Sequence, residues 1–283
     1  MKEALYYKKI EDGKVECLLC PQECKIADGK AGFCRVRKNE SGTLYALTYN
    51  RTTSVALDPI EKKPLYHFHP GEHILSLGTK GCNLACLFCQ NWAISQDDNT
   101  RPRAITAADA VEEAKERGSF GIAYTYNEPF VWYEFILESS KLARTGGLKN
   151  VLVTNGYVNK EPLEEILPYI DAMNIDLKSI EDGFYGKICK GRLAPVLETI
   201  KITAARCHVE ITNLVIPGFN DSDENFKKLA DWIAENTGED TPLHFSRYFP
   251  CYKMDSPPTP IETLERAAKI AKRRLKLVYL GNV

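Results

Sequence analysis

From about residue 73 onward, short apolar runs alternate with amphipathic segments of about 10 to 15 residues. This alternation predicts βαβ units around a parallel sheet, because parallel strands need a crossover connection that is usually a helix. We expect strands at residues 74–77, 121–125, 151–154, 172–177, 209–215, 243–246 and 277–280. About six β/α units are fewer than the eight of a closed barrel, so the sequence predicts an α/β fold with an open, partial barrel.

Helix signals lie between the expected strands. Thr106 and Asp109 match a capping box, in which the two residues satisfy each other's backbone N–H groups at a helix start. Thr259, Pro260 and Glu262 mark a second helix start. Two further helices are expected at residues 130–143 and 225–234. Chemistry is expected at the carboxyl ends of the strands, where the βα loops meet.

The first 70 residues differ from the rest of the chain in their residue composition. They are rich in turn formers, and they carry four cysteines: Cys17, Cys20, Cys24 and Cys34. We therefore expect two domains, a cysteine-rich module at 1–70 and the partial barrel at 71–283. Four thiolates suit tetrahedral zinc and equally suit an auxiliary iron-sulfur cluster, and the spacing does not choose between them. Partly unmetallated cysteines are the third alternative.

Composition restricts the partners and the compartment. The formal net charge of -1 provides no basic field that would attract nucleic acid or an anionic membrane. No run approaches 18 apolar residues, and the first residues lack the basic and then apolar layout of a secretory signal, so we expect a cytoplasmic protein without a membrane partner. Ten cysteines in close clusters then indicate metal sites before disulfides.

Three of these cysteines form the most informative motif. Cys82, Cys86 and Cys89 have the spacing CxxxCxxC and follow the first expected strand of the barrel. Three ligands on a 4Fe-4S cluster leave one iron open, whereas electron carriers use four cysteines. The alternative is a non-enzymatic electron carrier or a zinc-binding interaction module, completed by a fourth ligand such as Cys189 or Cys207.

With Phe88, these three cysteines resemble the CxxxCxΦC signature of the radical SAM superfamily. The resemblance implies a partial (β/α)6 barrel and a 4Fe-4S cluster whose open iron binds S-adenosylmethionine (SAM). It also implies that one electron from the cluster releases methionine and a 5′-deoxyadenosyl radical. An electron donor such as flavodoxin or ferredoxin would be a partner.

The resemblance also assigns roles to residues at the ends of later strands. Those expected to contact SAM or the substrate are Asn127, Glu128, Asn155, Asp176, Lys178 and Arg247, with Lys178 also among the catalytic residues. A carboxylate facing the methionine ammonium would form a charge-assisted hydrogen bond, which suits Glu128. Structural alternatives exist: Glu128 could cap a helix, Asp176 and Lys178 could form an ion pair, and Arg247 could pair with a barrel carboxylate.

Resemblance covers nearly the whole chain, including the runs at 17–21, 58–65, 90–92 and 244–250. It is to the radical SAM enzyme of the AmmeMemoRadiSam system, a homologue of pyruvate formate-lyase activating enzymes. Members commonly continue past the last four residues here, so the chain could be a natural short form or a truncated one. The implied substrates are a protein with a glycine loop, a small molecule, or a system partner of the AMMECR or Memo type.

Overall fold

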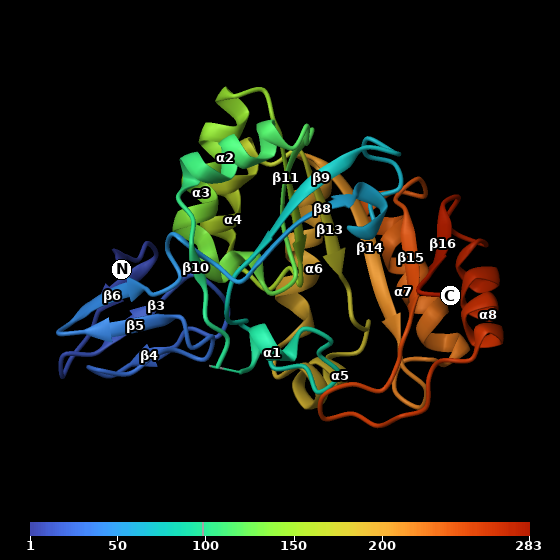
Figure 1. Cartoon of the computed structure of the whole chain (residues 1–283). Coiled ribbons are helices and arrows are strands. Elements are labelled where there is room, and N and C mark those ends of the chain that lie inside the picture. The colour runs from blue at the N-terminus through green and yellow to red at the C-terminus, as the bar shows by residue number, and fades with distance from the viewer. Residues whose placement is uncertain (98) are drawn as a thin grey trace.

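The computed structural model describes residues 1–97 and 99–283, and in these residues a curved eight-stranded sheet forms the centre of the molecule (Figure 1). Neighbouring strands pair in the order β16-β15-β14-β13-β12-β11-β9-β8. Its strands are β8 (Ser54–Pro59), β9 (His73–Gly78), β11 (Gly121–Tyr124), β12 (Lys149–Thr154), β13 (Ala172–Asp176), β14 (His208–Val215), β15 (Leu243–Arg247) and β16 (Val278–Gly281). All pairs are parallel except β8 with β9.

A helix connects each parallel strand to the next, and the helices cover the outer face of the sheet (Figure 1). They are α2 (Ala107–Glu116), α3 (Tyr133–Thr145), α4 (Lys160–Ile166), α6 (Leu193–Ala204), α7 (Asp223–Thr237) and α8 (Ile261–Ala271). The expected α/β partial barrel is confirmed, and all seven expected strands lie within two residues of their expected bounds. Within the described chain, no helix combines the length and apolar character needed to cross a membrane.

Short elements fill the connections. They are η1 (Ile60–Lys62), α1 (Trp92–Ser95), η2 (Pro129–Trp132), η3 (Leu167–Tyr169), α5 (Asp182–Phe184), the π-helix η4 (Tyr185–Cys189), and the paired strands β7 (Arg51–Thr52) and β10 (Arg103–Ala104). The helix expected from residue 130 therefore begins as a 3-10 turn. Pro260, and not Thr259, is the N-cap of α8, because the Thr259 hydroxyl donates to the Val215 carbonyl and accepts from the Tyr248 amide.

The N-terminal residues form two small antiparallel sheets beside the barrel (Figure 1). Their strands are β1 (Lys2–Glu3), β2 (Tyr7–Lys9), β3 (Val15–Cys17), β4 (Lys25–Ile26), β5 (Arg37–Glu40) and β6 (Thr43–Ala46). β8 also lies before residue 70, yet it pairs with β9 in the main sheet. A division at residue 70 thus assigns one barrel strand to the N-terminal module.

The capping box expected at Thr106 is present at the start of α2. The Thr106 hydroxyl accepts from the Asp109 amide at 3.1 Å, and the Asp109 carboxylate accepts from the Thr106 amide at 2.8 Å. A Thr106→Ala substitution should lower the free energy of unfolding by about 1 kcal/mol, because an orphan N–H of the first turn loses its acceptor. Urea denaturation measures the loss. Thr106→Ser keeps the hydroxyl and should stay within a few tenths of a kcal/mol of the wild type, and an equal loss in both variants would contradict the capping role.

Candidate active site

A cavity of about 330 Å³ opens at the carboxyl ends of the barrel strands. Its lining comes from the loop after β9, which carries the three clustered cysteines, and from the ends of β11 to β15. Expected site residues that line it are Cys82, Cys86, Phe88, Cys89, Asn127, Glu128, Asn155, Asp176 and Lys178. The fold therefore brings together side chains that are almost 100 positions apart in the sequence.

Hydrogen bonds from neighbouring loops hold the cysteine loop in place. The Asn127 amide group accepts from the Thr79 N–H at 3.0 Å and donates to the Gly81 carbonyl at 2.9 Å. Asn155 donates to the Asn83 side chain at 2.9 Å and to the Cys82 sulfur at 3.6 Å. Asn127 and Asn155 thus position the loop that carries the thiols.

The three thiols of Cys82, Cys86 and Cys89 could in principle hold a single metal ion or a 4Fe-4S cluster. Among residues 1–97 and 99–283, no three His, Cys, Asp or Glu side chains are close enough to bind one metal ion. A single ion shared by Cys82, Cys86 and Cys89 therefore does not fit. The donor set suits a 4Fe-4S cluster, because such a cluster binds each thiolate to a different iron and all three cysteines line one cavity.

The two candidates for a fourth ligand occupy different places. Cys207 immediately precedes β14, so it lies at the amino end of that strand, away from the cavity. Cys189 is buried beside Cys86, and its backbone carbonyl accepts from the Ala85 amide at 2.9 Å. Neither residue lines the cavity. Within the described lining, the three motif cysteines are the thiols that face it.

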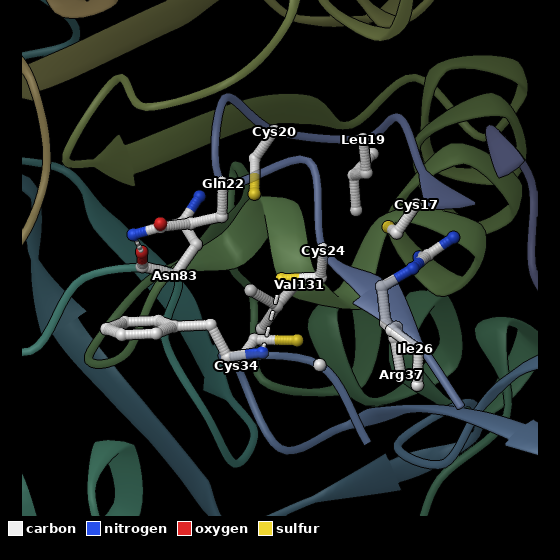
Figure 2. A pocket seen from close by; sticks show the side chains of 12 residues that line it. Cys17, Leu19, Cys20, Gln22, Cys24, Ile26, Cys34, Arg37, Asn83 and Val131 are labelled. Atoms are coloured by element: carbon white, nitrogen blue, oxygen red, sulfur yellow. Dashed lines mark hydrogen bonds between the residues drawn. The ribbon is translucent and has the colours of Figure 1, made fainter. Parts of the chain in front are cut away.

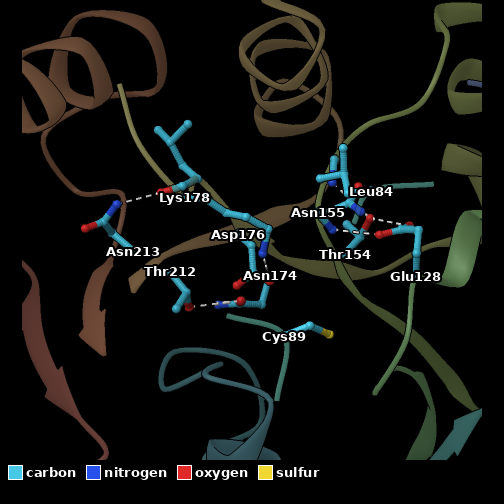
Figure 3. Close-up of polar contacts among 12 residues, drawn as sticks. Leu84, Cys89, Glu128, Thr154, Asn155, Asn174, Asp176, Lys178, Thr212 and Asn213 are labelled. Carbon is cyan, nitrogen blue, oxygen red and sulfur yellow. Dashed lines mark hydrogen bonds and ion pairs between the residues drawn. The ribbon is translucent and has the colours of Figure 1, made fainter. Parts of the chain in front are cut away.

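Glu128 caps a helix and also lines the cavity (Figure 3). Its carboxylate caps η2 through the Phe130 amide at 3.0 Å, and it also accepts from the Thr154 hydroxyl at 2.7 Å and the Asn155 amide at 2.8 Å. Burial raises the pKa of Glu128 to about 7, although these three donors act in the opposite direction. A carboxylate has about four acceptor positions, so one remains for a ligand in the cavity.

Asp176 and Lys178 form the ion pair that was one of the expected alternatives. Lys178 Nζ lies 3.0 Å from Asp176 Oδ2 and 5.8 Å from the centre of the Phe88 ring. Burial disfavours the ammonium, but the Asp176 carboxylate together with the nearby Cys86 and Cys189 side chains keeps the pKa of Lys178 above its ordinary value. Both side chains still line the cavity, so the pair presents one fixed cation and one carboxylate to a ligand.

A comparison with protein families identifies the family of this chain. A family model described as the radical SAM superfamily matches residues 76–233, which are more than half of the chain and include the cysteine motif. The chain belongs to the radical SAM superfamily. The likeness predicted from the CxxxCxΦC signature is thus confirmed at the level of the family.

Relatives of this radical SAM protein include several activating enzymes. An uncharacterised protein of Methanocaldococcus jannaschii is 49% identical over 100% of this chain and 86% of its own length. A pyruvate formate-lyase-activating enzyme of Clostridium pasteurianum is 26% identical over 54% of this chain and 66% of its own length. The (2S)-3-sulfopropanediol dehydratase activating enzyme of Klebsiella oxytoca is 26% identical over 48% of this chain and 45% of its own length. The chain therefore spans less than two thirds of these named activases.

Solved structures support the same radical SAM fold. A domain of a pyruvate-formate lyase-activating enzyme from Bacteroides vulgatus aligns with a TM-score of 0.51, at 22% identity over 57% of this chain and 99% of that domain. SuiB of Streptococcus suis, solved with S-adenosylmethionine, aligns with a TM-score of 0.56 at 18% identity, over 74% of this chain and 52% of SuiB. At these identities the likeness concerns the fold alone.

Arg247 is the expected radical SAM site residue that the fold does not bring into the cavity. Its Nε donates to the Thr259 carbonyl at 2.8 Å, and its guanidinium lies 4.9 Å from the centre of the Phe249 ring. These contacts hold the side chain against the loop after β15, so it is absent from the lining. Arg247 pairs with a backbone carbonyl here, and no barrel carboxylate is its partner among the described contacts.

A polar group on the β8 side of the cavity was not predicted from the sequence. Lys63 Nζ and the Tyr126 hydroxyl each lie 2.8 Å from Asp58 Oδ2, and Lys62, Lys63 and Tyr126 line the cavity. Asp58 is partly buried, which opposes ionisation, but the Lys63 and Tyr126 hydrogen bonds lower its pKa to about 2. The run at 58–65 was the signal in the sequence, and only the pairing of β8 with β9 brings it to the site.

The four N-terminal cysteines of the radical SAM chain line a second, smaller cavity (Figure 2). Cys17 ends β3, Cys20 and Cys24 lie between β3 and β4, and Cys34 precedes β5. Asn83, which follows the first cysteine of the other motif, also lines this cavity. The two cysteine sets are therefore neighbours in the fold.

Proposed function

We propose that this protein is an oxidoreductase of the radical SAM class that cleaves SAM reductively into methionine and a 5′-deoxyadenosyl radical. One observation carries the proposal: Cys82, Cys86 and Cys89 line the same cavity as Glu128, at the catalytic edge of a radical SAM barrel. A 4Fe-4S cluster on the three thiolates would supply an open iron and one electron to the SAM sulfonium. The electron donor would be of the flavodoxin or ferredoxin class, and the compartment the cytoplasm.

Residues of the chain would bind and orient SAM. Glu128 has one acceptor position left for the methionine ammonium, and a charge-assisted hydrogen bond there would fix the amino acid end. Lys178 is partly buried and held by Asp176, so its ammonium is a preorganised donor for a carboxylate or ribose oxygen. Phe88, beneath Lys178, is 4% exposed and helps to exclude water from the cysteine loop.

The reaction class proposed for the radical is hydrogen abstraction from a substrate, and relatives of this chain are named as activating enzymes. Those relatives support an activase-like reaction, and they share only about half of the chain. A protein substrate of the glycyl-radical type would have to present a flexible loop to the cavity mouth. Lys62, Lys63 and Tyr126 would be the groups that such a substrate meets on the β8 side.

Anaerobic turnover tests the proposed function. The protein is purified with its iron, reduced with dithionite and mixed with SAM, and 5′-deoxyadenosine and methionine are quantified by chromatography. Formation of both products in equal amounts is the expected result, because each cleavage releases one of each. A reduced, iron-loaded protein that yields neither product, and whose EPR spectrum does not change with SAM, would favour the non-enzymatic electron carrier. A chain that takes up zinc and no iron would favour the interaction module.

A Glu128→Gln variant should bind SAM about 10- to 100-fold more weakly. The reason is the loss of a hydrogen bond to a charged group, which contributes about 1.5–3 kcal/mol. Because burial raises the pKa of Glu128 to about 7, wild-type affinity should also fall as the pH drops below 7, where the carboxyl becomes protonated and cannot accept from an ammonium. The variant should lose this pH dependence.

Equilibrium titration of the iron-loaded protein with SAM measures both effects. Glu164→Gln is the control, because Glu164 lies on the exposed face of α4 in an ion pair of 3.9 Å with Lys160. Unchanged SAM affinity in Glu128→Gln would mean that the carboxylate serves only to cap η2.

A further inference from the structure

The geometry points to a second iron-sulfur cluster, bound by Cys17, Cys20, Cys24 and Cys34, in place of the zinc ion that the spacing alone would equally allow. All four thiols line one cavity, and their sulfurs are directed into the same space (Figure 2). Hairpin pairing explains how they meet: β3 pairs with β4, and the Cys17 amide donates to the Cys24 carbonyl at 3.0 Å.

The spacing of the sulfurs argues against zinc. In a tetrahedral site each Zn–S bond is about 2.3 Å, which places the four sulfurs about 3.8 Å from one another. Among the described residues, no group of three Cys, His, Asp or Glu side chains is arranged to hold one metal ion. A cluster binds each thiolate to its own iron or shares an iron between two of them, so wider spacing is what it requires.

The lining of the N-terminal cavity also suits a cluster, because all four cysteines line it together with apolar side chains. Leu19, Ile26 and Val131 complete an apolar lining that would shelter a cluster from water.

Backbone amides face the sulfurs of the N-terminal cysteines, as they also do at the barrel motif. The Phe33 amide donates to the Cys24 sulfur at 3.3 Å, and the Gln22 and Val36 amides face Cys20 and Cys34. At the barrel motif, the Leu84 amide donates in the same way to the Cys82 sulfur at 3.4 Å. Such hydrogen bonds stabilise cluster thiolates and tune their potential.

The two cysteine loops are in direct contact. Gly81, at a φ of +85°, packs so closely on the Cys34 carbonyl that an added Cβ would lie 2.6 Å from its oxygen. Gln22 Nε2 donates to the Asn83 carbonyl at 3.0 Å, which ties the N-terminal loop to the residue after Cys82. A cluster with four protein ligands has no open iron, so its role would be to pass single electrons from a low-potential carrier to the first cluster. This role rests on the proposed function, whereas the cluster itself does not.

Metal analysis of a Cys82→Ala, Cys86→Ala, Cys89→Ala variant tests the inference. The variant is isolated anaerobically from cells supplied with iron and zinc, and it is analysed before any reconstitution. We expect about four iron and four sulfide atoms per chain, or about two of each for a smaller cluster, and essentially no zinc. Its reduced EPR spectrum should not change on addition of SAM. Further replacement of Cys20 and Cys24 by alanine should remove this iron.

Control measurements keep the outcomes separate. Cys207 lies at the amino end of β14, whereas the barrel motif lies at the carboxyl ends of the strands. A Cys207→Ala variant should therefore retain the full iron content of the wild type. About one zinc per chain, or no metal at all, in the triple variant would overturn the inference. If the variant with all five cysteines replaced does not fold, the iron, sulfide and zinc contents of the triple variant still distinguish a cluster from zinc. Absence of SAM cleavage by the wild type would overturn the proposed function and leave the N-terminal iron count unaffected.

Discussion

Replacement of Cys82, Cys86 and Cys89 together by alanine is expected to reduce SAM cleavage to the background of the assay while the chain stays folded. The loss should be complete, because the three thiols are the ones that face the cavity in its described lining. Folding should survive, since the loop is held by Asn127 and Asn155 through contacts that do not need the thiols of Cys86 and Cys89. Quantification of 5′-deoxyadenosine and methionine after dithionite reduction measures the effect.

Cys207→Ala is the matched control for this loss, as it removes a cysteine of similar burial at the amino end of β14. It should retain wild-type turnover. Circular dichroism shows whether each variant remains folded. Substantial product from a folded triple variant would contradict the assignment of the cleavage site to this loop.

Arg37→Met is expected to lower the free energy of unfolding by about 3–5 kcal/mol, the typical cost of leaving one partner of a buried ion pair uncompensated. Arg37 Nη1 lies 3.0 Å from Glu134 Oε1, and the two side chains are only 2% and 1% exposed. The same carboxylate accepts from the Leu5 amide at 2.8 Å, and Arg37 also donates to the Leu5 carbonyl. The pair therefore connects the N-terminal sheets to α3 of the barrel.

Urea denaturation under reducing conditions measures this loss, with metal content determined in the same samples because Arg37 lines the N-terminal cysteine cavity. Lys160→Met removes one partner of an exposed pair and should cost less than about 1 kcal/mol. An Arg37→Met, Glu134→Leu double variant should recover most of the stability, since no buried charge remains. A single variant as stable as Lys160→Met would show that the buried pair contributes little.

Local periodicity was sufficient to predict the barrel. Each parallel strand is a short apolar run and each helix an amphipathic segment, so their positions depend mainly on neighbours in the sequence. β8 was missed because its residues, Ser54–Pro59, are all partly exposed and mix polar with apolar side chains. Its place depends on pairing with β9, which a local pattern does not reveal.

The candidate site was likewise predicted from the sequence only in part. The cysteine motif and the residues at the strand ends were predicted, because carboxyl ends of parallel strands necessarily meet at one edge. Arg247 was expected at the cavity and is absent from it, because its guanidinium is engaged by the Thr259 carbonyl. Lys62 and Lys63 reach the cavity through the extra strand, and no spacing in the sequence indicated this.

By itself, the sequence determined the family, the order of strands and helices, and the three thiols that define the chemistry, since these depend on residue type and on short-range spacing. Tertiary structure alone decided that Glu128 has three protein donors and one free acceptor position. It also decided that the N-terminal cysteines surround a cavity next to the barrel motif. Both facts depend on distances between segments far apart in the chain, and such distances are set by packing of the whole fold.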